Sequence, residues 1–533
     1  MLQSKLLVGV TLFYAGCALD TYSADPAAPE VARLQSAIGD EEKNDFRNRK
    51  TDKKTFAKRK EDCSNDPRVA LGLVTQNICV GADLFFRDAF GGNGRACGTC
   101  HTAQFDFTIS PEFIASLAPD DPLFVAENNP ALAGLERPDL MRGFGLILEN
   151  VDGAEAPTTK FVMRSVPHCF SLATSIAPPP INPLTGVAAD GSTQPPIQRT
   201  GWSGDGAPNP GGLKQFQVGA ITQHYTKSLD RNVGSDFTLP SDEELTRIED
   251  FLRSIGRSTE VALASVSLSD SGAEAGRVKF LGSRCNGCHS NAGANVASGT
   301  NFNFDTGVER ARLSVLDSMN IPRDGGFGAA AQGAPFNHDA NGDGTLDSFG
   351  DGRFNTPPLI EAADTAPFFH ENGAATIEDA TRFYTTDAFK NSLAGGGNAI
   401  ALTEQEITDI GKFLRVMNAS LNLKLAAIRL DAMVKIAAEY KNHFKGLQFG
   451  LLDAARAELL DALNELSEVM ILPAVQTHLG TANQAITTAF SNTSAKDRED
   501  AAALALAEVE AAAAGLGTGT GLNFPIGQGS LMF

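Results

Sequence analysis

Two five-residue motifs carry the chemistry that this sequence offers. Residues 97–101 read Cys-Gly-Thr-Cys-His, and residues 285–289 read Cys-Asn-Gly-Cys-His. In each motif two thiols lie about one helical turn apart, so each can bond one vinyl group of a haem, and the following imidazole can reach the iron. The predicted attachment and ligand residues of two c-type haems are Cys97, Cys100, His101, Cys285, Cys288 and His289.

The alternative to haem is a redox-active or zinc-binding Cys-x-x-Cys pair that an unrelated His happens to follow. The complete pattern occurs twice, which favours haem. Two covalent haems predict an electron-transfer or redox protein, and the question is whether it also does chemistry.

Length and charge limit the remaining classes. A chain of 533 residues is long enough for about three domains. Its formal net charge of -20 argues against nucleic acid or anionic lipid as a partner and allows a basic electron-donor protein, although solubility alone explains the charge equally well.

The N-terminus predicts export from the cytoplasm. Lys5 precedes a short apolar run over residues 6–15, and Gly16 and Cys17 follow it. We weigh lipidation of Cys17 evenly against plain signal cleavage nearby. Cys63 and Cys79 are spaced to form a disulfide in an oxidising compartment, which leaves Cys169 as a small buried apolar residue. The expected location is the periplasm or cell envelope, with a lipid anchor on Cys17 as one alternative.

The expected fold class is mainly α, with two cytochrome c-like haem domains and a C-terminal helical hairpin or bundle. In each half a short helical segment leads into the haem motif, and an amphipathic helix closes the domain. The ranges are 1–17 for the export signal, 18–61 for a polar tether, 62–260 and 261–418 for the haem domains, 419–516 for about three further helices, and 517–533 for a flexible tail.

Residues from about 82 to 418 resemble the bacterial di-haem cytochrome c peroxidases and their relative, the methylamine dehydrogenase maturation enzyme. The resemblance rests on six segments and is strongest in the last three. They are Leu-Phe-Phe-Arg-Asp (84–88), Arg-Ser-Val-Pro (164–167), Gly-Trp-Ser-Gly-Asp-Gly (201–206), Asn-Thr-Pro-Pro-Leu (355–359), Thr-Ala-Pro-Phe-Phe-His-Glu-Asn-Gly (365–373) and Thr-Ile-Glu-Asp-Ala-Thr-Arg-Phe-Tyr (376–384).

The resemblance implies a division of labour between the haems. The first would be the peroxidatic haem and the second an electron relay. Tyr384 stands 14 residues after His370, where the family has the distal ligand of the relay haem. Trp202 stands where the family keeps a Trp between the haems. The alternatives are a helix residue with its hydroxyl at the surface for Tyr384 and a core anchor for Trp202.

The sequence departs from the family in the peroxidatic pocket. Gln217 falls near the family's Gln in one alignment, but no carboxylate stands where the family has Glu. His224 is the best substitute by residue type as a proton carrier, against an ordinary hydrogen-bonded His. No His or Met lies between His101 and Met141, which predicts an open first haem unless His168 or His224 ligates it.

Residues 339–347 follow the D-x-N-x-D-G pattern of calcium loops, apart from the usual Glu at the twelfth place. The expected ligands are Asp339, Asn341, Asp343, Thr345 and Asp347. The alternative is a solvated acidic turn.

Taken together, the sequence predicts an exported di-haem cytochrome that reduces hydrogen peroxide, or another small oxidant, with electrons from a small donor protein. One alternative keeps the enzyme but lets high-valent iron oxidise a protein or an organic molecule. The other is an electron carrier without catalysis. We expect the C-terminal helices to serve in docking or in a homodimer.

Overall fold

The computed structural model describes residues 50–533, apart from 152–157, 193–195, 207–210, 329–335, 337 and 493. The described chain is mainly helical, as predicted, and its strands are short. The expected export signal at 1–17 and most of the expected tether lie outside the described residues. No described helix combines the length and the hydropathy needed to cross a bilayer.

The α-helices are α2 (Phe56–Ser64), α3 (Pro67–Ala70), α4 (Gln76–Arg87), α5 (Cys97–Cys100), α6 (Pro111–Ser116), α7 (Val125–Asn128), α8 (Pro138–Phe144), α9 (Leu172–Ser175), α10 (Leu213–His224), α11 (Asp242–Leu252), α12 (Ser271–Gly282), α13 (Cys285–Cys288), α14 (Ser314–Ser318), α15 (Ile377–Phe383), α16 (Asp387–Lys390), α17 (Glu404–Tyr440), α18 (Lys445–Glu468), α19 (Pro473–Ser491) and α20 (Ala495–Leu516). The strands are β1 (Leu146–Asn150), β2 (Phe161–Ser165), β3 (Ser267–Leu268), β4 (Asn303–Phe304), β5 (Phe354–Asn355) and β6 (Gly517–Thr518). They form three two-stranded antiparallel sheets, β1–β2, β3–β6 and β4–β5.

Helices α4 and α11 pack against each other. In the sequence, α4 precedes the first Cys-x-x-Cys-His motif and α11 follows it. They cross at Gly81, where a Cβ atom would lie 1.9 Å from the carbonyl oxygen of Arg247, so a larger residue would force the helices apart. Phe85 and Phe86 of α4 pack against Phe251 of α11. The first haem motif, on α5, follows α4 in the chain.

The same arrangement occurs a second time. Helix α12 packs on α17 at Gly276, where a Cβ atom would lie 1.9 Å from the carbonyl oxygen of Asp409. The Phe280 and Phe413 rings meet with their centroids 5.5 Å apart. The second haem motif, on α13, follows α12. Both halves thus place a Cys-x-x-Cys-His segment directly after one helix of a tightly crossed pair.

The β1–β2 hairpin connects the two halves. Its register pairs Leu146 with Ser165 and Asn150 with Phe161. Arg164 of β2 forms two hydrogen bonds, of 2.6 and 2.7 Å, with the carboxylate of Asp324 in the second half.

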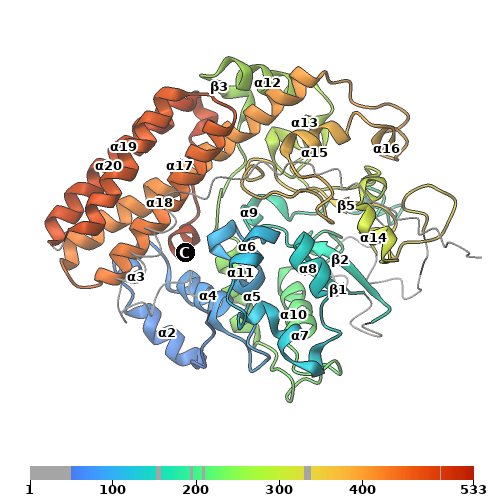
Figure 1. Cartoon of the computed structure of the whole chain (residues 1–533), viewed down its shortest axis with the longest axis horizontal. Helices are drawn as coiled ribbons and strands as arrows, with labels where there is room; N and C mark the ends of the chain where they lie inside the picture. Colours follow the sequence, from blue (N-terminus) through green and yellow to red (C-terminus); the bar gives the residue numbers. More distant parts are fainter. Residues whose placement is uncertain are drawn as a thin grey trace, which may run out of the picture. The chain divides into compact units, whose positions relative to one another are not determined.

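The C-terminal helices α17–α20 lie side by side (Figure 1) and pack on one another. The predicted boundary at residue 418 is not a break, because α17 continues from Glu404 to Tyr440. The region after Tyr440 holds three helices, and with α17 they make a bundle of four. A single helix therefore closes the second half and begins the bundle.

Two expectations at the chain's ends are wrong. The predicted tether includes the start of α2, where Arg59 is fully buried among the carboxylates of Asp52, Asp83 and Asp88. The predicted flexible tail, 517–533, is packed: β6 pairs with β3, and the last three residues are buried. Its glycines allow the backbone to pack closely against residues 254–268, where a Cβ atom would clash.

Candidate functional site

A cavity of about 290 Å³ contains the first haem motif. It is lined by Cys97, Cys100 and His101, by the end of the β2 strand, and by one face of α10. A second cavity of about 180 Å³ contains Cys285, Cys288 and His289. Each predicted haem motif therefore faces a hollow, and the two motifs do not share one.

The two motif histidines have the tautomer that iron ligation requires. His101 Nδ1 lies 3.0 Å from the carbonyl oxygen of Phe107, and His289 Nδ1 lies 3.0 Å from that of Pro357. A carbonyl only accepts, so Nδ1 carries the hydrogen and Nε2 keeps its lone pair. Burial lowers the pKa of both rings, that of His289 to about 4, and so favours the neutral form that binds metals.

The motif thiols are protonated in the absence of a metal, because burial raises the pKa of Cys97 and that of Cys288 to about 11. The two pairs line different cavities and cannot form one four-cysteine zinc site. The disulfide joins Cys63 to Cys79, as expected. Cys169 is free and buried, with its Sγ 3.4 Å from His101 Nδ1.

Tyr384 lines the second cavity together with His289, so the structure brings the two predicted ligands of the relay haem to one hollow. Its ring packs edge-on against Phe383 and Phe389, which restricts its orientation. Burial raises the pKa of the Tyr384 phenol, which therefore stays protonated in the absence of a cation. Ligation of an iron by Tyr384 stays a prediction.

Trp202 lines both cavities. Its indole Nε1 donates a hydrogen bond of 2.9 Å to the carbonyl oxygen of Ser165, and its own carbonyl accepts one of 2.8 Å from the amide of Asn355. Ser165 of the first half thus holds the indole, and Asn355 of the second half holds the backbone of the same residue. This position between the cavities fits the predicted bridge.

Helix α10 brings Gln217 and His224 to the wall of the first cavity, seven residues apart on one helix face. The amide of Gln217 is buried, and among the described residues neither of its polar atoms has a hydrogen-bond partner. Burial, together with Arg95 and Arg231, lowers the pKa of His224 to about 3. His224 is therefore a weak base, which does not favour the predicted role in proton transfer.

Two carboxylates near the first cavity were missed by the sequence analysis. Glu149 of β1 lines the cavity and pairs with Arg164 at 2.6 Å. Glu136 is buried, pairs with Arg95 at 2.7 Å, and lies 4.0 Å from His224 Nδ1. Neither belongs to a local motif, and only the β1–β2 pairing brings Glu149 to the wall.

The predicted calcium loop satisfies many of its oxygens internally. Asp339 accepts hydrogen bonds from the amides of Gly342, Asp343 and Gly344. Asp347 pairs with Arg323 at 2.7 Å. Thr345 closes the turn through its amide, which donates to Asp343. Calcium binding by this loop stays a prediction.

Comparison of the chain with protein-family models, with curated proteins and with solved structures finds no significant match. The case for a function therefore rests on the motifs and on the geometry: two hollows, each with two thiols and a correctly oriented imidazole, and one indole that borders both.

Proposed function

We propose that this chain is an exported di-haem c-type cytochrome that reduces hydrogen peroxide at the first cavity with electrons that enter at the second. The observation that carries the proposal is that each Cys-x-x-Cys-His motif opens into its own cavity with the His Nδ1 beside a carbonyl oxygen, which favours a lone pair on Nε2. The crossed pair of helices, one before and one after each motif in the sequence, supports a cytochrome c-like unit in each half. The Cys63–Cys79 disulfide supports an oxidising compartment.

The residues around the cavities fit this chemistry. A bound haem supplies an iron that exchanges electrons and, where a coordination position is open, takes up peroxide. His101 and His289 would each bind the iron of one haem. Gln217 is placed to donate a hydrogen bond to a small oxidant in the first cavity, because its buried amide is otherwise unsatisfied. Glu149 offers the carboxylate that the sequence appeared to lack.

The first experiment counts the haems. The pyridine haemochrome spectrum of the purified chain should give two c-type haems, and the variants Cys97→Ala/Cys100→Ala and Cys285→Ala/Cys288→Ala should each give one. Cys169→Ala is the matched control, because Cys169 is buried beside His101 but lies outside the motifs. A wild-type chain without covalent haem would overturn the proposal.

The second experiment tests for catalysis. Optical and EPR spectra of the isolated protein should contain a high-spin ferric signal that disappears with one equivalent of hydrogen peroxide. Two low-spin haems that peroxide leaves unchanged, even after half-reduction, would contradict the peroxidase function and leave an electron carrier.

A further inference from the structure

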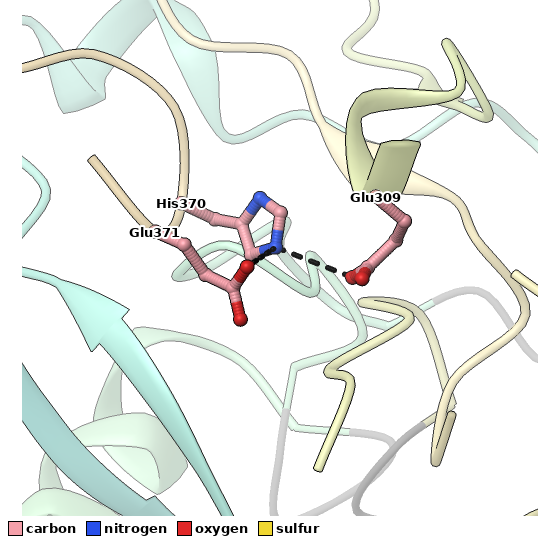
Figure 2. Close-up of side chains that lie close together, drawn as sticks. All are labelled: Glu309, His370 and Glu371. Atoms are coloured by element: carbon pink, nitrogen blue, oxygen red, sulfur yellow. Dashed lines mark ion pairs between the residues drawn. The ribbon is translucent and has the colours of Figure 1, made fainter. Parts of the chain in front are cut away.

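Three buried side chains form a cluster outside the cysteine motifs. Glu309, His370 and Glu371 each offer one donor atom, and these atoms all lie within 4.8 Å of one another. Figure 2 shows the ring of His370 between the two carboxylates. Their exposed fractions are 0%, 2% and 1%, so water cannot solvate the charges freely.

The distances in the cluster match the edges of a metal coordination shell. His370 Nε2 lies 3.2 Å from Glu309 Oε1 and 3.8 Å from Glu371 Oε2. Two ligands of a tetrahedral zinc ion, each about 2.0–2.1 Å from the metal, lie about 3.3 Å apart. Despite the short separation, Nε2 and Glu309 Oε1 do not form a directed hydrogen bond, and both ring nitrogens of His370 are buried without one.

The surroundings hold the three donors in place. Arg312 donates to both carboxylate oxygens of Glu371, at 2.9 and 3.1 Å. The amide of Gly325 donates to Glu309 Oε1 at 2.8 Å, while Glu309 Oε2 has no hydrogen-bond partner among the described residues. The His370 ring stacks on Phe354 with centroids 4.0 Å apart. Metal-binding carboxylates are commonly supported by such outer hydrogen bonds.

Charged groups of both signs surround the cluster. Asp324 is a third buried carboxylate and is paired with Arg164, and Arg323 lies 3.8 Å from Glu309 Oε2. A divalent cation between Glu309 and Glu371 would offset the repulsion between these two buried carboxylates.

We propose that Glu309, His370 and Glu371 bind one divalent ion of the zinc class, with water completing its coordination. One imidazole and two carboxylates suit zinc, and manganese second. Because Glu309 lies on the 3₁₀ turn Val308–Ala311 and the other two ligands lie on the segment after β5, the ion would join two separate stretches of the second half. His370 also lines the second cavity, but neither Cys-x-x-Cys-His motif supplies a ligand to this site.

Anomalous diffraction from crystals of the full chain, measured on both sides of the zinc edge, tests the site directly. The expected result is a zinc peak about 2 Å from His370 Nε2, distinct from any iron. Elemental analysis after dialysis should give about one zinc per chain in addition to iron.

The variant Glu309→Gln should lose most of this zinc. Glu458→Gln is the matched control, because Glu458 is also buried and pairs with Arg429 in the C-terminal bundle, and this variant should keep the metal. If the wild-type chain binds no zinc or manganese after incubation with an excess of either ion, or if the peak lies elsewhere, the proposal is wrong and the cluster is a protonated His370 held by two carboxylates.

Discussion

In the proposed function, electron transfer between the two cavities depends on the indole of Trp202. It borders both hollows, and its hydrogen bond to Ser165 fixes its plane. We expect Trp202→Phe to leave both haems attached but to slow electron transfer between them, since Phe loses the hydrogen bond and part of the π-system. Stopped-flow spectroscopy of the half-reduced protein measures this rate. An unchanged rate would assign Trp202 to packing alone.

Arg164 is buried between the halves and pairs with Glu149 and Asp324. We expect Arg164→Met to lower the free energy of unfolding by about 3–5 kcal/mol, because it leaves Asp324 buried without its cation. Urea unfolding measures the loss. The control is Arg382→Met, whose ion pairs are solvent-exposed and should contribute little to stability. Equal losses in the two variants would contradict the argument.

For single residues, the sequence identifies candidate functional residues only where they belong to a local motif. Thiol and imidazole spacing is set within one turn of chain, so both Cys-x-x-Cys-His motifs could be located before any fold was known, and haem attachment to them stays a prediction. Glu149, Glu309 and Glu371 were not assigned roles, because Glu149 and Glu309 acquire their neighbours through long-range packing, and the adjacent pair His370 and Glu371 meets Glu309 in the same way. His224 was assigned one by residue type, but the acid–base role depended on its surroundings, and burial works against it.

Among the elements, helix α18 presents an unusual group of acids to the segment after β5. Glu465 of α18 is buried, and as a carboxylate it has no hydrogen-bond partner among the described residues. Burial and the nearby Asp364 raise its pKa well above the usual range. Asp364 in turn accepts hydrogen bonds from Asn418 and Asn422 of α17. A protonated Glu465 can donate to Asp364, whereas an ionised one repels it.

The acids around Glu465 act in the same direction. The carboxylates that act on Glu465 are Asp364, Asp461 and Asp106. Glu458 and Arg429, which pair with each other, act on Asp106 and Asp461. The folded state therefore holds protons that the unfolded state releases above about pH 4. Stability from this group is present below that pH and is lost as pH rises through the raised pKa.

We expect Glu465→Gln to reduce the loss of stability between pH 5 and pH 8, since an amide keeps a hydrogen-bond donor and does not ionise. Each unit by which the folded-state pKa of Glu465 lies above 5, within this range, contributes about 1.4 kcal/mol to that difference. Urea unfolding at both pH values measures it. Glu468→Gln, on the exposed side of the same helix, should keep the wild-type dependence. If both variants behave alike, Glu465 does not carry the pH dependence.

The sequence predicted the presence of these helices better than the residues at which they begin and end. Apolar periodicity indicated helices before residue 418 and after it, and both are present. The expected boundary failed because α17 serves two partners in succession, α12 and then the bundle helices, without a turn between them. The change of composition near residue 418 therefore marks the point where α17 changes its packing partners, and the helix does not end there.

Over the whole molecule, the C-terminus connects parts that are distant in sequence. The Leu531 carbonyl accepts a hydrogen bond of 2.8 Å from buried Arg68 of α3. The ring of Phe533 meets that of Phe107 edge-on, with centroids 4.8 Å apart, and lies beneath the guanidinium of Arg429 from α17. Phe107 is also the residue whose carbonyl holds His101. The glycine content of residues 517–533 predicted a flexible tail. That prediction failed because composition does not reveal contacts with residues that are distant in the sequence.

This contact gives the last residue of the chain an effect on the first cavity. We expect Phe533→Ala to lower the free energy of unfolding by about 3 kcal/mol, because it opens a hole beside Phe107. The loop that orients His101 should then exchange its amide hydrogens faster, whereas the region around His289 should not. Hydrogen–deuterium exchange measures both regions in one experiment. Leu393→Ala is the control, because its side chain is 78% exposed and should leave stability and exchange unchanged. If Phe533→Ala behaves like this control, the tail merely covers the surface, and His101 keeps its orientation without it.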